Sequence, residues 1–490
     1  MPWGCTAAGH KLNRNGEGEN MDKQGITADK KTVFDLKFFI KWGIAIGVPC
    51  ILYFAIPQTE AVSLEMRKFF VCTAWAILTW AMNLLPVYIS GLLLTVGAIL
   101  WGVAPANVVL SPWTGSVVWL SLGGLTLSVI FEKSGLMQRI AYFFIVKSGG
   151  SYKGIITGIT LSGIVVGLLV PNMTGRVALY CALCFGIYNA LKIPKNSNTG
   201  AGIMFAGFVA AIAPSWLYLS ASENLQLVNS YLKETGNSVS WMQYFISNFP
   251  VMLLWLIVLL IMVRILFKQD ASIDGKEYFK EKQESLGKMS KKEIKFLVIL
   301  ILLVIAMVFS GIDAGWLFIL AVIACFLPGV DVADIEDMKQ VNFPMVFFVA
   351  ATMAIGSMSN AVGVAGLVSE LMMPILQNVG NFGLILFAWL TGVITDMMMT
   401  PLAGMAAFSP LFIDIAAKLG LSVVGTTFSF VWGVEQLFFP YEWALFLILF
   451  SYDVFDMKKA MKFCTVRTIL SIIFLALLIY PYWMMTGFLR

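Results

Sequence analysis

The sequence predicts an all-α polytopic membrane protein, and three observations support that fold class. Of the 490 residues, 59% are hydrophobic and only 12% are charged, whereas a soluble protein has about 25% charged residues. Apolar stretches long enough to cross a bilayer recur along the chain. Lysine and arginine gather in a few segments between these stretches. Together these features exclude a soluble globular protein and predict about eleven transmembrane helices.

Residues 1–37 form a polar, basic tail before the first apolar stretch. The tail lacks the apolar run of a secretory signal, and Met21 offers a second start, so whether residues 1–20 belong to the native protein stays open. Basic runs can bind nucleic acid. Here, as in the lysine-rich segment 268–295, they flank apolar spans and mix with acidic residues. We therefore interpret both as cytoplasmic segments and expect no nucleic-acid partner.

The first half, residues 38–267, combines continuous and interrupted apolar stretches. The basic segment 134–150 has the pattern of an amphipathic helix that lies along the membrane surface. The stretch 154–191 is broken near its middle and predicts a hairpin, and the broken stretch 200–233 predicts a discontinuous helix. Continuous spans are predicted at 38–56, 69–84, 87–103, 113–131 and 240–267.

The second half, residues 296–490, repeats this order after the cytoplasmic linker 268–295. A hairpin is predicted at 380–418 and a discontinuous helix at 421–450. An offset of 228 residues places Gly135 on Gly363 and Asn172 on Thr400, which indicates a weak internal repeat. Continuous spans are predicted at 296–311, 314–328, 341–360 and 465–486, and a loop at 358–380.

The distribution of positive charge predicts the topology. If each hairpin leaves the membrane on the side where it entered, with one hairpin from each side, most basic residues fall on the side of the N-terminal tail, which is then cytoplasmic. The two halves then insert in opposite orientations, as inverted repeats, in a bacterial-type inner membrane. Inverted repeats with discontinuous helices are typical of carriers that bind their substrate near the middle of the membrane. The basic residues on this side are the tail, Lys133, 139–153, Lys192, Lys195, 268–295, Lys339 and 458–467.

Helix interruptions are costly in lipid, because each unpaired backbone group costs several kcal/mol there. Four interruptions at paired positions favour a protein-enclosed site. The alternative is a set of packing kinks at Pro171, Pro214, Pro401 and Pro440.

The first hairpin carries PNMTGR at residues 171–176, and SASEN follows at residues 220–224. With the order of elements from about 38 to 488, these residues resemble the divalent anion/sodium symporter family. Each hairpin tip of that family carries Ser-Asn-Thr, which many members extend to PSNTAR at the first tip, and the motif that follows is GTPPN. Pro171, Thr174, Arg176 and Asn224 keep that pattern, whereas Asn172 and Met173 replace Ser and Asn. The resemblance implies an elevator-type carrier, a homodimer and substrate carboxylates bound at the tips. It assigns substrate contact to Asn172, Met173, Thr174, Arg176, Thr400 and Pro401.

Charged residues at the interruptions are the other candidates for function. Arg176 would bind an anion through its planar fork; the alternative is an internal ion pair, with Glu223 or Glu442. Near the second pair of interruptions lie Asp396, Glu435 and Glu442, which with Asn224 are candidates for coupling to a cation. A buried carboxyl can carry a proton; the alternative is that these carboxylates only hold the broken helices. Sodium prefers oxygen ligands, whereas the tips are rich in methionine, so both Na⁺ and H⁺ stay open as coupling ion.

These features predict a secondary active transporter that couples Na⁺ or H⁺ to uptake of small di- or tricarboxylates or similar divalent anions. The nearest alternative is an ion antiporter or efflux permease of the wider ion-transporter superfamily; a channel is a further one. An enzyme is disfavoured, because the single histidine, His10, lies in the tail and no zinc-protease or nucleotide-binding motif is present. No cofactor is expected.

Overall fold

The fold is all-helical in the part of the chain that the computed structural model describes, residues 36–82, 84–170, 172–273, 275–398, 400–438 and 443–489. Nine helices of these segments are long and apolar enough to cross a membrane, and four shorter apolar helices accompany them. This confirms the predicted fold class. Eleven crossings, the inverted orientation of the halves and the re-entrant hairpins stay predictions.

The first half begins with three helices, α1 to α3, and two short turns that lead into α5. The segment 154–191, predicted as a hairpin, forms α7 followed by α8. The discontinuous helix consists of α9, two 3₁₀ turns and α10. The bounds are α1 Leu36–Ala55, α2 Leu64–Ala81, α3 Val87–Leu100, α4 Ala106–Val109, η1 Ser111–Thr114, α5 Ser116–Ser134, α6 Leu136–Lys147, α7 Tyr152–Leu169, α8 Met173–Ala190, α9 Asn198–Ile212, η2 Ala213–Trp216, η3 Leu219–Ala221, α10 Glu223–Glu234 and α11 Trp241–Leu266.

The second half follows the same order after α12, a helix in the lysine-rich linker. The segment 380–418, predicted as a hairpin, forms α18 followed by α19, and the segment 421–450, predicted as a discontinuous helix, forms α20 followed by α21. The bounds are α12 Lys276–Ser285, α13 Lys291–Phe309, α14 Ala314–Phe326, α15 Ile335–Lys339, α16 Phe343–Ala361, α17 Val364–Leu376, α18 Asn381–Met398, α19 Pro401–Leu419, α20 Val423–Val434, α21 Ala444–Phe450, α22 Met457–Phe474, the π-helical turn η4 Leu475–Ile479 and α23 Tyr480–Thr486.

One sequence-based expectation is wrong. The segment 358–380 is not a loop, because its centre forms α17. This helix follows Gly363, and α6 follows Gly135; both glycines adopt positive φ, at 80° and 76°. Such a backbone suits glycine, which lacks the Cβ that clashes there. The two residues paired by the internal repeat thus make the same sharp turn between consecutive helices.

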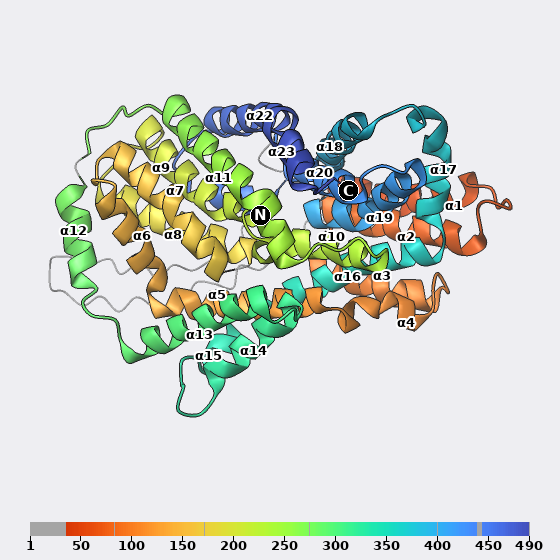
Figure 1. The fold of residues 1–490 in the computed structure, drawn as a ribbon. Coiled ribbons are helices and arrows are strands. Elements are labelled where there is room, and N and C mark those ends of the chain that lie inside the picture. The colour runs from red at the N-terminus through yellow and green to blue at the C-terminus, as the bar shows by residue number, and fades with distance from the viewer. Residues whose placement is uncertain are drawn as a thin grey trace.

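Two groups of helices lie on opposite sides of the molecule (Figure 1). The helices α6 to α9 occupy one side and α17 to α20 the other, while α5 packs against α14 along one edge. In each group the first hairpin helix packs on the first arm of the discontinuous helix, α7 on α9 and α18 on α20.

Candidate functional site

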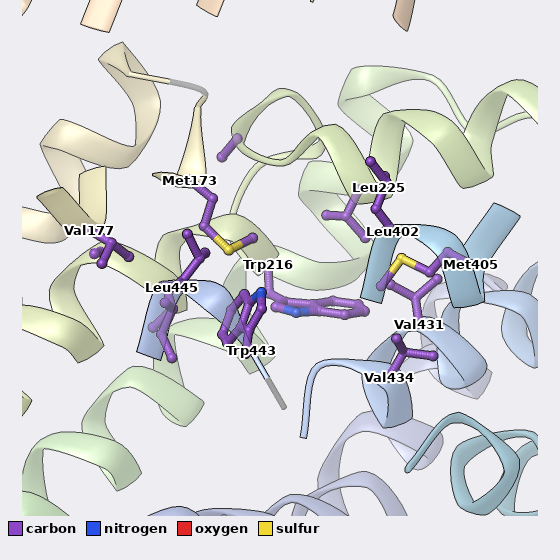
Figure 2. Packing of buried hydrophobic residues seen from close by; sticks show 14 of the residues in the cluster. Met173, Val177, Trp216, Leu225, Leu402, Met405, Val431, Val434, Trp443 and Leu445 are labelled. Atoms are coloured by element: carbon purple, nitrogen blue, oxygen red, sulfur yellow. The ribbon is translucent and has the colours of Figure 1, made fainter. Parts of the chain in front are cut away.

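The interrupted segments of both halves meet in one buried cluster (Figure 2). Trp216, from the first discontinuous helix, lies between side chains of the two halves in this view. The cluster is apolar, so it holds the interruptions together by burial rather than by charge. Its labelled members are Met173 and Val177 of α8, Trp216, Leu225 of α10, Leu402 and Met405 of α19, Val431 and Val434 of α20, and Trp443 and Leu445 at the start of α21.

The first hairpin tip is held by Asn172, the residue that caps α8. α7 ends at Leu169, and the extended backbone of Val170 turns the chain. Asn172 Oδ1 then accepts a 2.6 Å hydrogen bond from the backbone N–H of Gly175, which satisfies one of the free donors at a helix start. The other end of the amide, Nδ2, donates to Oε1 of Glu223, the first residue of α10. The tip is therefore tied to the second arm of the discontinuous helix.

Arg176 links the first hairpin tip to the end of α9 and to the two 3₁₀ turns of the discontinuous helix. Its side chain is 0% exposed. Nη1 donates to the carbonyls of Val170 and Ala221 at 2.6 and 2.8 Å, and Nε donates to the carbonyl of Ala211 at 2.8 Å. Nη2 donates to Ser215 Oγ at 2.6 Å. Four of the five N–H groups of a guanidinium thus bind the protein itself, and the charge lies within electrostatic range of Glu223.

Those four bonds favour a structural role for Arg176, and its contact with substrate stays a prediction. Of the other two residues predicted at this tip, Met173 is buried in the apolar cluster, and Thr174 is half-buried on the first turn of α8.

Glu435 joins the two halves. It follows the last residue of α20 and is 2% exposed. Its Oε2 accepts a 2.5 Å hydrogen bond from Trp216 Nε1, and its Oε1 accepts a 3.1 Å bond from Asn224 Nδ2. The structure therefore brings together two of the residues predicted for cation coupling, Asn224 and Glu435. Their role in coupling stays a prediction.

Arg467 is a buried charge that the sequence analysis did not single out as a site residue. It was counted among the cytoplasmic basic residues of 458–467, yet it is 4% exposed in α22. Its Nη1 donates to the backbone carbonyl of Glu435 at 2.7 Å, and the guanidinium lies within electrostatic range of Glu435 and Asp396. Its spacing of three and four residues from the buried Cys464 and Phe463 is a helical pattern that could have indicated this.

At the second hairpin tip, the described residues show no capping bond like that of Asn172 at the first. Thr400 caps α19 but makes no side-chain capping bond, and its hydroxyl is buried without a hydrogen-bond partner among the described residues. Pro401 is the first residue of α19 and is buried. Asp396, on the last turn of α18, is 2% exposed. Glu442, also predicted for coupling, lies outside the described residues, as do Pro171 and Pro440.

The sequence pattern of the sodium:sulfate symporter transmembrane region matches residues 37–489. The chain belongs to this family. The resemblance noted from its hairpin motifs is thereby confirmed, and so is the interpretation that the chain is not an enzyme, because the family consists of symporters.

Individual relatives are distant. The chain is 26% identical over 329 residues to a membrane protein of Cupriavidus necator, covering 62% of this chain and 64% of that protein. It is 25% identical over 349 residues to the chloroplastic dicarboxylate transporter 1 of Spinacia oleracea, covering 68% and 60%. It is 22% identical over 233 residues to a sodium-dependent dicarboxylate transporter of Staphylococcus aureus, covering 45% of each. The chain thus spans less than two thirds of the length of these relatives.

Proposed function

We propose that this chain is a cation-coupled secondary transporter of small organic anions. The observation that carries the proposal is the meeting of the two discontinuous helices, where Trp216 and Asn224 of one half hold the carboxylate of Glu435 in the other. Non-helical backbone persists at membrane depth only where protein or an enclosed cavity surrounds it. Its paired occurrence is characteristic of carriers that alternate access around a fixed site.

The chemistry of the substrate follows from the helix starts. The hairpin helices α8 and α19 begin at Met173 and Pro401 within the interrupted region. A helix start carries partial positive charge and free N–H groups, so it favours an anion. The names of the spinach and Staphylococcus relatives make dicarboxylates the class to test first, and tricarboxylates are the next.

The coupling ion would act at the carboxylates of the second half. Glu435 and Asp396 are both buried. A buried carboxylate can take up a proton or help to hold Na⁺ through its oxygens. The name of the Staphylococcus relative favours sodium. We further propose an elevator motion of the hairpins and discontinuous helices against the continuous spans, in a homodimer whose N-terminus is cytoplasmic.

Reconstituted proteoliposomes test the proposal. With an inward Na⁺ gradient, an inward H⁺ gradient or neither, uptake of radiolabelled succinate and citrate is measured against empty liposomes. We expect accumulation that collapses when the driving gradient is dissipated. Absence of gradient-driven uptake for every anion tried would overturn the symport proposal.

The buried carboxylates also support a second candidate, an ion antiporter. Such a protein exchanges cations through Glu435 and Asp396 without an organic anion. A pH-sensitive dye inside the same proteoliposomes distinguishes the two functions. Proton release on addition of external Na⁺, in the absence of any carboxylate, would favour the antiporter.

A further inference from the structure

The segment that leads into α13 exposes positive charge that its own acidic residue does not neutralise. Residues 285–295 contain one acidic residue, Glu293, which is 8% exposed. Its Oε1 accepts a 2.6 Å hydrogen bond from Arg139 Nε, and its Oε2 accepts a 2.5 Å bond from the backbone N–H of Ser290. The carboxylate is therefore turned inward, and its charge is matched by that of Arg139. The four lysines of the segment are exposed: Lys288, Lys291, Lys292 and Lys295.

The backbone that carries Lys288 is held from α6. Arg139 Nη1 donates a 2.8 Å hydrogen bond to the carbonyl of Gly287, and Nη2 donates to the carbonyls of Leu286 and Lys288 at 2.7 and 3.3 Å. The helix start that follows is fixed as well, because Ser290 caps α13 through a reciprocal pair of bonds. The lysines thus project from an ordered turn, so a ligand that binds them has little backbone left to order.

Three of the four ammonium groups are available to a ligand. Lys295 Nζ donates to the carbonyls of Gly329 and Val330 at 2.5 and 3.1 Å. These acceptors are neutral, so they leave the charge of Lys295 uncompensated. The other three lysines of the segment form no hydrogen bond or ion pair with any residue that the structure describes. The surface therefore carries four positive charges, three of them on side chains without a partner in the described part of the chain.

An exposed apolar face of α13 continues directly from these lysines. The helix corresponds to the continuous span predicted at 296–311 and lies at the edge of the molecule beside α14 (Figure 1). Lys291 lies three residues before Ile294, so both share one face of the helix. The residues of this apolar stripe recur at helical spacing and are 47–49% exposed: Ile294, Val298, Ile301 and Ile305. The opposite face is buried in the protein, through Phe296, Leu300, Leu303 and Met307.

We infer that this end of α13 binds an anionic phospholipid, with the headgroup phosphate on the lysines and an acyl chain along the apolar stripe. Clusters of lysine beside a membrane span attract anionic lipids, and a phosphate accepts charge-assisted hydrogen bonds from ammonium groups. A free phosphate ion would use the lysines alone. A phospholipid uses both features, because its charge and its apolar chain are joined in the same order as the lysines and the stripe.

A second copy of the chain fits this face less well. In a membrane, two copies insert with the same orientation, so α13 packed on α13 would place the two lysine clusters side by side. Like charges repel there, whereas an anionic headgroup neutralises them. The lipid site involves neither the hairpin tips nor a transported anion, so it goes beyond the proposed function and does not depend on it.

The experiment measures thermal unfolding of the full-length protein in detergent with increasing phosphatidylglycerol, and with phosphatidylcholine of the same acyl chains as the neutral lipid. We expect phosphatidylglycerol to raise the unfolding temperature of wild type more than phosphatidylcholine does, because a ligand of the folded state stabilises it. Glycerol 3-phosphate, the headgroup without acyl chains, should give no such rise. Native mass spectrometry of the same samples counts the phosphatidylglycerol molecules that stay bound.

The variant that tests the site is Lys288→Gln/Lys291→Gln/Lys292→Gln, which changes exposed side chains only. It should need at least about tenfold more phosphatidylglycerol for half of the wild-type rise, because each lysine near an anionic lipid surface strengthens binding about fivefold. The corresponding triple arginine variant keeps the charges and should keep the response.

The matched control removes three exposed lysines from the rest of the same linker, as Lys268→Gln/Lys280→Gln/Lys282→Gln. In α12 the lysines alternate with Glu277, Glu281 and Glu284, so this variant should respond to phosphatidylglycerol as wild type does.

Three results would overturn the inference. The first is a wild-type protein that responds equally to phosphatidylglycerol and phosphatidylcholine. The second is a loss of response in the control variant as large as in the site variant, which would show attraction by net charge alone. The third is an equal rise with glycerol 3-phosphate, which would show a site for free phosphate and no role for the apolar stripe.

Discussion

Trp216 Nε1 donates a 2.5 Å hydrogen bond to Oε2 of Glu435, a residue 219 positions further along the chain. Both side chains are 2% exposed. The indole ring also packs edge-on against Trp432 of α20, with ring centroids 4.8 Å apart. One residue of the first interruption thus contributes a polar and an apolar contact to the second, so the two discontinuous helices are fixed relative to each other.

Replacing Trp216 by phenylalanine should remove the hydrogen bond while leaving an aromatic ring against Trp432. A hydrogen bond to a charged group contributes about 1.5–3 kcal/mol, so we expect a clear fall in the temperature of unfolding in detergent. Trp119→Phe is the control, because that half-buried indole donates only to the neutral carbonyl of Trp113. An equal fall in unfolding temperature in the two variants would show that the charge of Glu435 does not strengthen the hydrogen bond from Trp216.

Because Asn224 and Glu435 are hydrogen-bonded, exchanging the amide and the carboxylate between the two positions should restore part of the stability that a single substitution removes. Asn224→Asp places a second carboxylate beside that of Glu435, where like charges repel in a buried environment. Glu435→Gln alone removes the charge that Trp216 and Asn224 bind. The double variant Asn224→Asp/Glu435→Gln restores one carboxylate and one amide, so its unfolding temperature should exceed that of Asn224→Asp. A double-mutant cycle measures the coupling, which we expect to be about 1 kcal/mol or more; additive effects would contradict the contact.

Arg176 is best tested by conservative replacement. Lysine keeps the charge but not the planar fork that binds several carbonyls at once. If the four bonds of Arg176 hold the first interruption, Arg176→Lys should lower the yield of folded protein and its unfolding temperature. If Arg176 instead contacts substrate, the variant should fold normally and show a raised KM for uptake. Size-exclusion profiles and uptake kinetics together distinguish the two roles.

The fold class and the positions of the helix interruptions could be predicted from the sequence. The length of an apolar stretch and the prolines within it are local features of the chain, so they can be found without knowing any tertiary contact. The offset that pairs Gly135 with Gly363 indicated an internal repeat, and in the structure both glycines adopt positive φ between consecutive helices. The helix α17 was missed because it is short and carries no lysine or arginine, so a charge-based topology treats it as a loop.

The partners of the candidate residues could not be predicted. Glu435 contacts Trp216 and Asn224 more than 200 residues away, and no local pattern encodes such a pairing. Arg467 was assigned to the cytoplasm because it follows three lysines, although its buried neighbours recur with helical spacing. The basic run was interpreted as lying before a span at 465–486, whereas the structure has a candidate span at Met457–Thr486 that includes it.

Close helix packing within the second half gives a prediction independent of the site. A Cβ on Gly433 of α20 would lie 2.0 Å from the carbonyl oxygen of Trp389 on α18, which is backbone and cannot rotate away. Gly433→Ala should therefore force the helices apart and cost about 1–3 kcal/mol. Gly186→Ala on α8 is the matched control, because nothing lies within 4 Å of its Cβ position. Similar unfolding temperatures for both variants would contradict the packing.

The last prediction concerns pH and the attachment of the linker to α9. Asp270 accepts hydrogen bonds from the backbone N–H groups of Asn198 and Thr199 at 2.6 and 3.0 Å and from the Thr199 hydroxyl at 2.9 Å. Partial burial opposes ionisation of Asp270, but these hydrogen bonds outweigh it and lower the pKa of the carboxyl. The carboxylate therefore stabilises the first turn of α9, a contribution of about 1 kcal/mol for a helix cap.

The sign of the pH dependence follows from the lowered pKa. The stabilisation is complete above the pKa of an unfolded aspartate, about 3.9, and is lost as the pH falls through the lower pKa of the folded state. Asp270→Asn should thus unfold at a lower temperature than wild type at pH 7, and the difference should narrow below about pH 4. Asp453→Asn is the control, because its ion pair with Lys195 is exposed and such pairs contribute little. If the difference in unfolding temperature between wild type and Asp270→Asn stays constant down to pH 3, the charge of the carboxylate does not stabilise the first turn of α9.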